Sequence, residues 1–116
     1  AAAVLTACGA DSPERLMQSA REYMAARDDR AAAIQLRNAL QQQPRNAEAR
    51  FLLGQVLARA GDFLSAEKEL RRALEYGHPA ERVYPDLAQV LLALGQPKTV
   101  VSELADRNLP DRDAQA

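Results

Sequence analysis

The sequence predicts an all-α protein, an α-solenoid built from about three helix-turn-helix repeats. Three observations lead to this prediction. Apolar and small residues recur at a spacing of 34 positions, a period typical of stacked helix pairs. Pro, Gly, Asn and Asp stand between the periodic segments, where helices start and stop. The composition is 47% hydrophobic with no Trp, and its abundant Ala and Leu favour closely packed helices over sheets.

The repeat is visible when the chain is aligned with itself. Shifted by 34 residues, four apolar positions of one segment meet identical residues: Ala32, Leu36, Ala39 and Leu40 fall on Ala66, Leu70, Ala73 and Leu74. A second shift places Leu53, Gly54, Leu57 and Gly61 on Leu87, Ala88, Leu91 and Gly95. This agreement indicates repeated units at residues 13–46, 47–80 and 81–106, of which the third is short or incomplete.

The first unit starts at Ser12, a good N-cap, with Pro13 at the first helical position. We expect one helix from Pro13 to about residue 26 and a second from about 30 to 43, where Pro44 ends it.

In the second unit, Asn46 caps a helix to about residue 60, and Gly61-Asp62 turns the chain. The partner helix covers about 63–76, and Gly77 suits the left-handed residue that follows a helix.

The third unit has a helix from Pro79 or Ala80 to about Leu94 and a short one that starts at Pro97 and fades near Ala105. Val100, Val101 and Leu104 leave an apolar stripe, and solenoid ends normally carry a polar face. We therefore expect residues 107–116 to be a loop or tail toward a further repeat, and residues 97–116 either to fray or to self-associate through that stripe.

Packing within a unit requires small residues where its two helices cross. These are Ala20, Gly54 and Ala88 on the first helices, with Ala32 and Ala66 facing them. Larger residues are expected to fill the seam around each crossing: Tyr23, Leu57, Leu91, Leu36, Leu70 and Leu104.

Few residues of the sequence suggest catalysis or metal binding. His78 is the only histidine, and we expect it in a solvated loop without the oriented partner that catalysis needs. Asp28-Asp29 falls at a helix start, where carboxylates cap N–H groups. Glu67-Lys68-Glu69 and Arg71-Arg72 place opposite charges on an exposed helix face. The sequence therefore predicts no enzyme, no cofactor and no metal site.

The charge balance and the cysteine content limit the classes of partner that the chain can bind. The chain has 15 basic and 16 acidic residues, so it has no bulk basic surface for nucleic acid. With a single Cys the chain cannot form an internal disulfide. With one Cys and one His it lacks the Cys and His ligands of a zinc site. Function should then lie in a protein-binding surface.

The spacing of Leu53, Gly54, Leu57, Gly61 and Ala66, continued by Leu70 and Ala73, resembles the tetratricopeptide repeat (TPR) consensus. The likeness covers about residues 13–105. It departs at Arg27 in place of the turn Gly, at Arg50 where Trp is preferred, and at Val100 in place of Ala.

The resemblance implies a concave groove, lined by the first helix of each unit, that binds an extended peptide or a partner helix. The groove positions are Glu14, Met17, Arg21, Met24, Glu48, Phe51, Gln55, Arg59, Arg82, Gln89 and Leu92. The alternative is that Phe51 and Met17 only pack between units, which fits Phe51 equally well. TPRs that clamp a terminal carboxylate carry Lys and Asn at inner positions where this chain has Met17, Arg21, Phe51 and Gln55, so that activity is not expected.

The start of the chain resembles a bacterial lipoprotein cleavage site. Leu5-Thr6-Ala7-Cys8-Gly9 combines an apolar residue, two small residues and the only cysteine of the chain. Residues 1–7 would be the end of a signal peptide, Cys8 the lipidated N-terminus and 8–12 a short linker. This implies lipid anchoring at the periplasmic side of the bacterial envelope, with the outer membrane favoured because Gly9, not Asp, follows Cys8.

Three runs, AIQLRNAL, PRNAEARFLLG and AEKELRRALE, look like the start of the TPR-repeat lipoproteins of PEP-CTERM/exosortase systems. That family is several times longer, so the chain would be an N-terminal piece. The resemblance implies a lipid-anchored scaffold for exopolysaccharide export or PEP-CTERM protein sorting. Two alternatives stay open: a TPR subunit or fused segment of a glycosyltransferase, and an assembly lipoprotein for outer-membrane proteins or pili.

Overall fold

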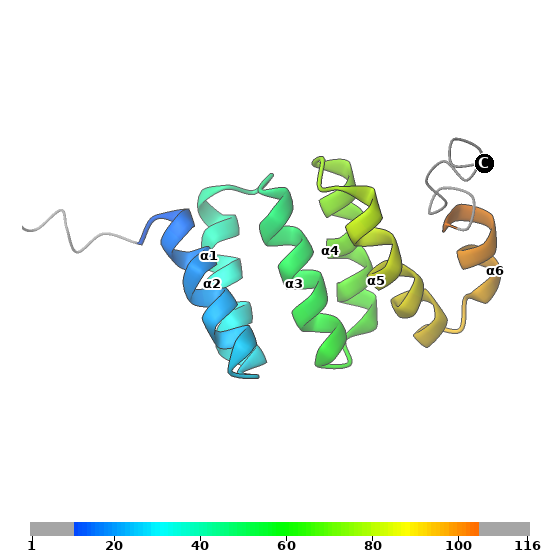
Figure 1. Cartoon of the computed structure of the whole chain (residues 1–116), viewed down its shortest axis with the longest axis horizontal. Helices are drawn as coiled ribbons and strands as arrows, with labels where there is room; N and C mark the ends of the chain where they lie inside the picture. The colour runs from blue at the N-terminus through cyan, green and yellow to red at the C-terminus, as the bar shows by residue number, and fades with distance from the viewer. Residues whose placement is uncertain (1–10, 105–116) are drawn as a thin grey trace, which may run out of the picture.

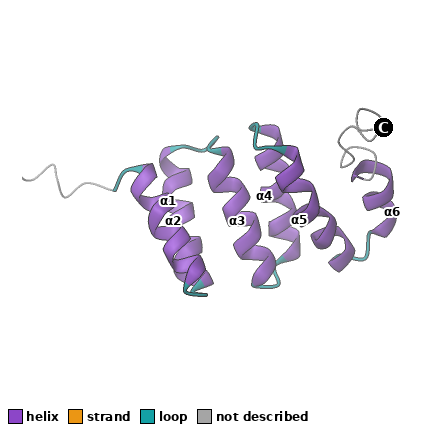
Figure 2. Cartoon of the chain, in the orientation of Figure 1, coloured by secondary structure: helices purple, strands orange, loops and turns teal. Residues whose placement is uncertain are grey.

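The fold is known from a computed structural model that describes residues 11–104. Its helices follow one another in a row, with α1 in front of α2 and α5 in front of α4 (Figure 1). In chain order they are α1 (Pro13–Ala25), α2 (Asp29–Gln42), α3 (Ala47–Arg59), α4 (Phe63–Glu75), α5 (Ala80–Ala93), α6 (Pro97–Thr99) and the π-helix η2 (Val100–Leu104). Every regular element within residues 11–104 is helical (Figure 2), so the all-α repeat fold is confirmed.

Side-chain caps fix the start of the first four helices. Ser12 Oγ accepts a hydrogen bond from the Arg15 N–H at 3.2 Å. Asp28, Asn46 and Asp62 do the same for the N–H three residues ahead, at 3.1, 3.0 and 3.2 Å. Because these bonds join residues three apart, they form from local sequence alone. The expected role of Asp28 as a helix cap is confirmed.

The turns inside the units also repeat. Arg27, Gly61 and Gly95, spaced by the period, have φ of 62°, 85° and 75°. Gly77 after α4 has φ 97°, the left-handed conformation expected for it. Arg27 therefore occupies a glycine position and carries the steric cost of a Cβ in that region.

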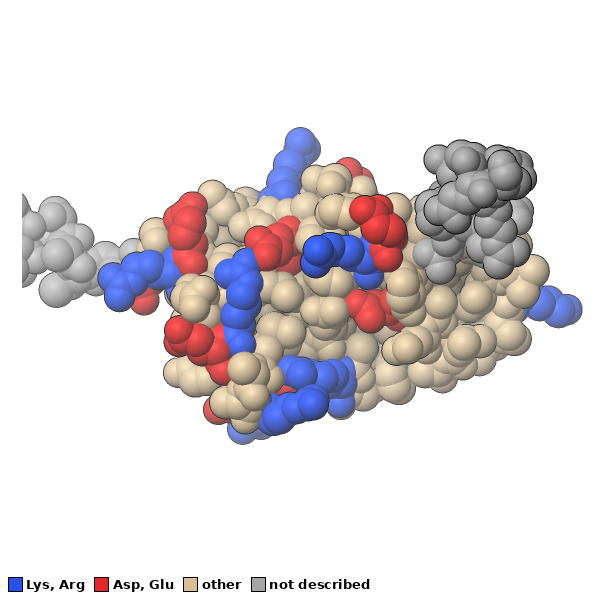
Figure 3. Space-filling model, viewed as in Figure 1, with Lys and Arg blue, Asp and Glu red and all other residues tan. Residues whose placement is uncertain are grey.

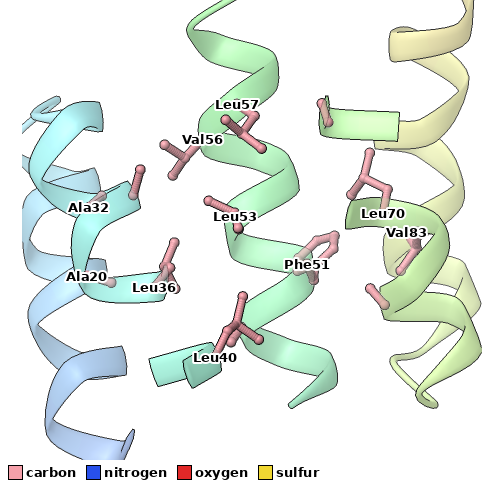
Figure 4. Packing of buried hydrophobic residues seen from close by; sticks show 14 of the residues in the cluster. Ala20, Ala32, Leu36, Leu40, Phe51, Leu53, Val56, Leu57, Leu70 and Val83 are labelled. Atoms are coloured by element: carbon pink, nitrogen blue, oxygen red, sulfur yellow. The ribbon is translucent and has the colours of Figure 1, made fainter. Parts of the chain in front are cut away.

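The core follows the crossings of paired helices. Ala20, Ala32, Ala66 and Leu70 are 0% exposed. A Cβ on Gly54 would lie 2.7 Å from Leu70 Cγ, so α3 and α4 approach closely only because this residue is glycine. Leu36 and Leu40 of α2 point toward α3, and Phe51 lies on the side of α3 that faces Val83 (Figure 4).

Tyr23 does not fill the seam as expected. It is 37% exposed, whereas its counterpart Leu57 is 7% exposed. The physical reason is the position of each helix in the row. Helix α3 lies between α2 and α4, while α1 packs mainly against α2.

The last helix also differs from expectation. An α-helix to about Ala105 was predicted, but α6 spans three residues and continues as the π-helix η2. Thr99, Val100 and Val101 are consecutive β-branched residues, which weaken α-helix formation. Leu104 is buried as predicted, at 4% exposure, while Val101 is 68% exposed.

No helix within residues 11–104 is long and apolar enough to cross a membrane. The predicted signal-peptide end at residues 1–7, the lipidation site Cys8 and the segment 107–116 lie outside the described residues. The unit boundaries proposed from the sequence remain predictions.

Candidate functional site

Two adjoining hollows lie over α1, α3 and α5. One, of about 350 Å³, is lined by Met24, Gln55, Ala58, Arg59, Phe63, Asp86, Gln89 and Val90. The other, of about 420 Å³, is lined by Arg21, Glu48, Phe51, Leu52, Gln55, His78, Arg82 and Asp86. Because Gln55 and Asp86 line both, the hollows form one surface, which we call the groove. A separate hollow over residues 43–46 lies in the loop between α2 and α3.

Polar contacts tie the helices of the groove together. Arg21 of α1 pairs with Glu48 of α3. Gln55 Nε2 of α3 donates to Asp86 Oδ2 of α5 at 2.9 Å. The exposed Arg21–Glu48 ion pair contributes less than about 1 kcal/mol, so it orients the two side chains more than it stabilises the fold.

Arg59 at the end of α3 makes a third contact of this kind. Its Nη2 lies 2.6 Å from Asp29 Oδ1 of α2. Acidic and basic residues are interspersed over the left and central part of the face shown in Figure 3. The groove is thus charged but mixed in sign.

The groove has an aromatic floor between α3 and α5. The rings of Phe51 and His78 stack with centroids 4.4 Å apart and an interplanar angle of 22°. Phe51 is 8% exposed, and it both packs between units and lines a hollow. The two interpretations of Phe51 from the sequence are therefore compatible.

His78 is not the solvated loop residue that the sequence suggested. It is half-buried, and its Nε2 has no hydrogen-bond partner within residues 11–104. Burial lowers the pKa of His78, with a smaller lowering from Arg82, while Glu48 and Glu81 act in the opposite direction. The imidazole is therefore neutral at pH 7 and adds a flat apolar surface.

Most predicted groove residues line the two hollows. They are Arg21, Met24, Glu48, Phe51, Gln55, Arg59, Arg82 and Gln89. Three others do not. Met17 is a core residue with 4% exposure and lines neither hollow. Leu92 is 54% exposed and lines neither hollow. Glu14 is exposed in the first turn of α1, outside both hollows.

Sequence reasoning missed several lining residues, of which Asp86 and His78 matter most. Asp86 could have been found, because residues 82, 86 and 89 share one face of a helix and two of them were named. His78 lies in the loop before α5, and the repeat period gives no rule for where a loop folds. The apolar lining residues Leu52, Ala58, Phe63 and Val90 were also missed.

The groove combines charged and apolar side chains. Within residues 11–104, no group of three or more His, Cys, Asp or Glu side chains is placed to hold a metal ion. Cys8, the predicted lipid site, is not among the described residues.

Comparison with known families gives a match to a repeat family. The family described as "Tetratricopeptide repeat" matches residues 23–85, more than half of the chain. The matched segment contains α2, α3 and α4 and most of the groove residues. The comparison with curated proteins finds no match.

Proposed function

Because this chain belongs to the tetratricopeptide repeat family, we propose that it is a scaffold that binds a protein partner through the groove. TPR proteins are typically interaction scaffolds without catalytic activity of their own. The observation that carries the proposal is the continuity of the two hollows over α1, α3 and α5. A surface that spans three helices and combines charged walls with apolar pockets suits an extended peptide or a helix.

Site-specific photocrosslinking in the native organism tests this proposal. A photoreactive residue at Gln89, in the groove, should crosslink to a defined partner. The same residue at Ile34, which is 51% exposed on α2 and lines neither hollow, is the matched control. The purified partner should then bind the wild-type chain, and Ala58→Trp, which fills the apolar part of the groove, should weaken binding. Equal crosslinking from both positions would contradict binding in the groove.

For its place in the cell, we propose anchoring through lipid on Cys8 at the periplasmic side of the envelope, with the outer membrane favoured. Support comes from Leu5-Thr6-Ala7-Cys8-Gly9. Stable attachment needs more than one acyl chain, so mass spectrometry should find a mature N-terminus at Cys8 that carries several. Cys8→Ser should move the protein to the soluble fraction. An unmodified and uncleaved N-terminus in cells would overturn this proposal.

The apparatus it serves is proposed from sequence resemblance. The likeness of residues 33–40, 44–54 and 66–75 to TPR lipoproteins of PEP-CTERM/exosortase systems supports a role in exopolysaccharide export or PEP-CTERM protein sorting. Deletion of the gene should lower secreted polysaccharide or mislocalise PEP-CTERM proteins, and the wild-type gene should restore them. Normal export and sorting in the deletion strain would contradict this role while leaving groove binding untouched.

A further inference from the structure

Asp86 differs from the other acidic residues of the groove in what it contacts. Glu48 has Arg21 as its ion-pair partner. Asp86, at the junction of the two hollows, accepts a hydrogen bond from the neutral amide of Gln55. No Lys or Arg of residues 11–104 forms an ion pair with Asp86. Its negative charge is therefore not compensated by this part of the chain.

Because Asp86 is more buried, its charge should contribute more to ligand binding than the charge of Arg82, the neighbouring residue of opposite sign. Asp86 is half-buried, whereas Arg82 is exposed and keeps its hydration. A carboxylate that has lost part of its water gains more from a cation than an exposed guanidinium gains from an anion. Arg82 precedes Asp86 by four residues, the less favourable order for a helical ion pair, and the two side chains do not pair.

An apolar pocket begins beside Asp86. Four apolar residues, Met24, Ala58, Phe63 and Val90, line the hollow of about 350 Å³ together with Gln55, Arg59, Asp86 and Gln89. Arg59, which also lines it, is already paired with Asp29. A bound chain would therefore meet an uncompensated carboxylate and an apolar pocket next to each other.

We propose that the groove recognises a partner segment in which a Lys or Arg side chain pairs with Asp86 and a nearby apolar side chain enters the pocket of Met24, Ala58, Phe63 and Val90. The inference rests on the proposed function and specifies its ligand. The charged group sets the register of the segment, and the apolar group supplies buried area.

A library of random dodecapeptides displayed on phage, selected on the purified full chain, tests the preference. Wild-type protein should select peptides with Lys or Arg close to Leu, Ile, Met or Phe. Asp86→Asn, which keeps the hydrogen bond from Gln55 but loses the charge, should lose the preference for basic residues. Glu75→Gln, an exposed carboxylate at the end of α4 and outside the groove, is the control and should keep it.

A double-mutant cycle on one selected peptide makes the test quantitative. Replacing its basic residue by Gln should weaken binding to the wild type about tenfold or more, as for a hydrogen bond to a charged group, and should hardly change binding to Asp86→Asn. Replacing its apolar residue by Ser should weaken binding to both proteins equally. Matching thermal unfolding curves exclude misfolding as the cause.

The outcomes separate this inference from the proposed function. Selected peptides that are acidic, and whose binding depends on Arg82, would overturn the basic ligand but keep groove binding. Peptides with equal affinity for wild type and Asp86→Asn would also overturn it. The absence of any selected peptide would contradict binding of peptides in the groove itself.

Discussion

At the scale of single residues, Gly54 decides how closely α3 and α4 approach. A Cβ there would lie 2.7 Å from Leu70 Cγ and 2.8 Å from Leu70 Cδ2, and Leu70 has no exposed surface into which it could move. We predict that Gly54→Leu lowers the free energy of unfolding by about 1–3 kcal/mol, because overpacking displaces side chains or backbone. Urea denaturation of the wild type and of the variant measures this change in the free energy of unfolding.

Ala88 offers a matched control for this variant. It occupies the same repeat position as Gly54 but is only half-buried, because its partner segment is the short α6 with η2. Ala88→Leu should therefore cost less than Gly54→Leu. Equal costs, or no cost for Gly54→Leu, would mean that the crossing of α3 and α4 is not as close as described.

His78 makes stability depend on pH. Burial lowers the pKa of its imidazole below the ordinary value of about 6.5, so the unfolded chain binds a proton more readily than the folded chain. Stability from this group is therefore fully present above pH 6.5 and is lost as pH falls from there toward the folded pKa. Glu48 and Glu81, which favour the proton, limit the loss, and Arg82 adds to it.

The measurement compares wild type with His78→Phe, which retains a ring to stack on Phe51 and cannot be protonated. Between pH 7.5 and 5.5, unfolding curves should show a larger loss of stability for the wild type. Carboxylates titrate in both proteins and cancel in the comparison. An equal loss in the two proteins would contradict a lowered pKa for His78.

At the scale of helices, a partly buried ion pair joins α3 to α4. Arg50 Nη1 lies 2.9 Å from Glu69 Oε2, and the two side chains are 13% and 11% exposed. Arg50 also donates to the Pro44 carbonyl from Nε and Nη2, at 3.1 and 2.8 Å. The sequence placed Glu69 on an exposed face, but the residue is buried at 8% exposure. Arg50, which stands where TPRs prefer Trp, thus forms a contact between two helices.

Removal of one partner should leave the other charge buried. We predict that Glu69→Ala destabilises the protein by about 3 kcal/mol, the lower part of the range for buried pairs, because some exposure remains. The double variant Arg50→Met with Glu69→Leu should lose less stability than the summed losses of the two single variants, Arg50→Met and Glu69→Leu. Additive effects in denaturant unfolding would show that the pair is not coupled.

At the scale of the whole molecule, stacking gives stability that varies along the row. Helices α3 and α4 each have neighbours on both sides, whereas α6 and η2 contact mainly α5. Arg71 pairs with Glu103 at 3.1 Å and so attaches η2 to α4, but this contact is exposed and weak. In repeat proteins, units with fewer neighbours open first.

Amide hydrogen exchange should therefore be slow over residues 47–76 and fast after Pro97. Fraying at that end was also the expectation from the sequence. The exchange should be measured in dilute solution, and sedimentation in the analytical ultracentrifuge should confirm that the protein is monomeric. Equal protection of α3 and η2 in a monomer would mean that η2 is held as firmly as the central helices.

Local rules explain what the sequence by itself determined. Helix starts at Ser12, Asp28 and Asn46 depend on bonds to residues three positions ahead, and left-handed turns depend on one residue each. The period of 34 then placed Gly54 against Leu70, because repeated units repeat their packing. The boundaries of the first five helices and the pairing of helices followed from these local rules and from the repeat.

The tertiary structure alone decided which faces are covered and which charges meet. Met17 and Met24 are seven residues apart and so lie on nearly the same face of α1, yet Met17 is buried and Met24 lines the groove. The burial of His78 depends on Phe51, which is distant in sequence. Burial and ion pairing arise where separate helices meet, and the spacing of residues along one helix does not encode the orientation of the next.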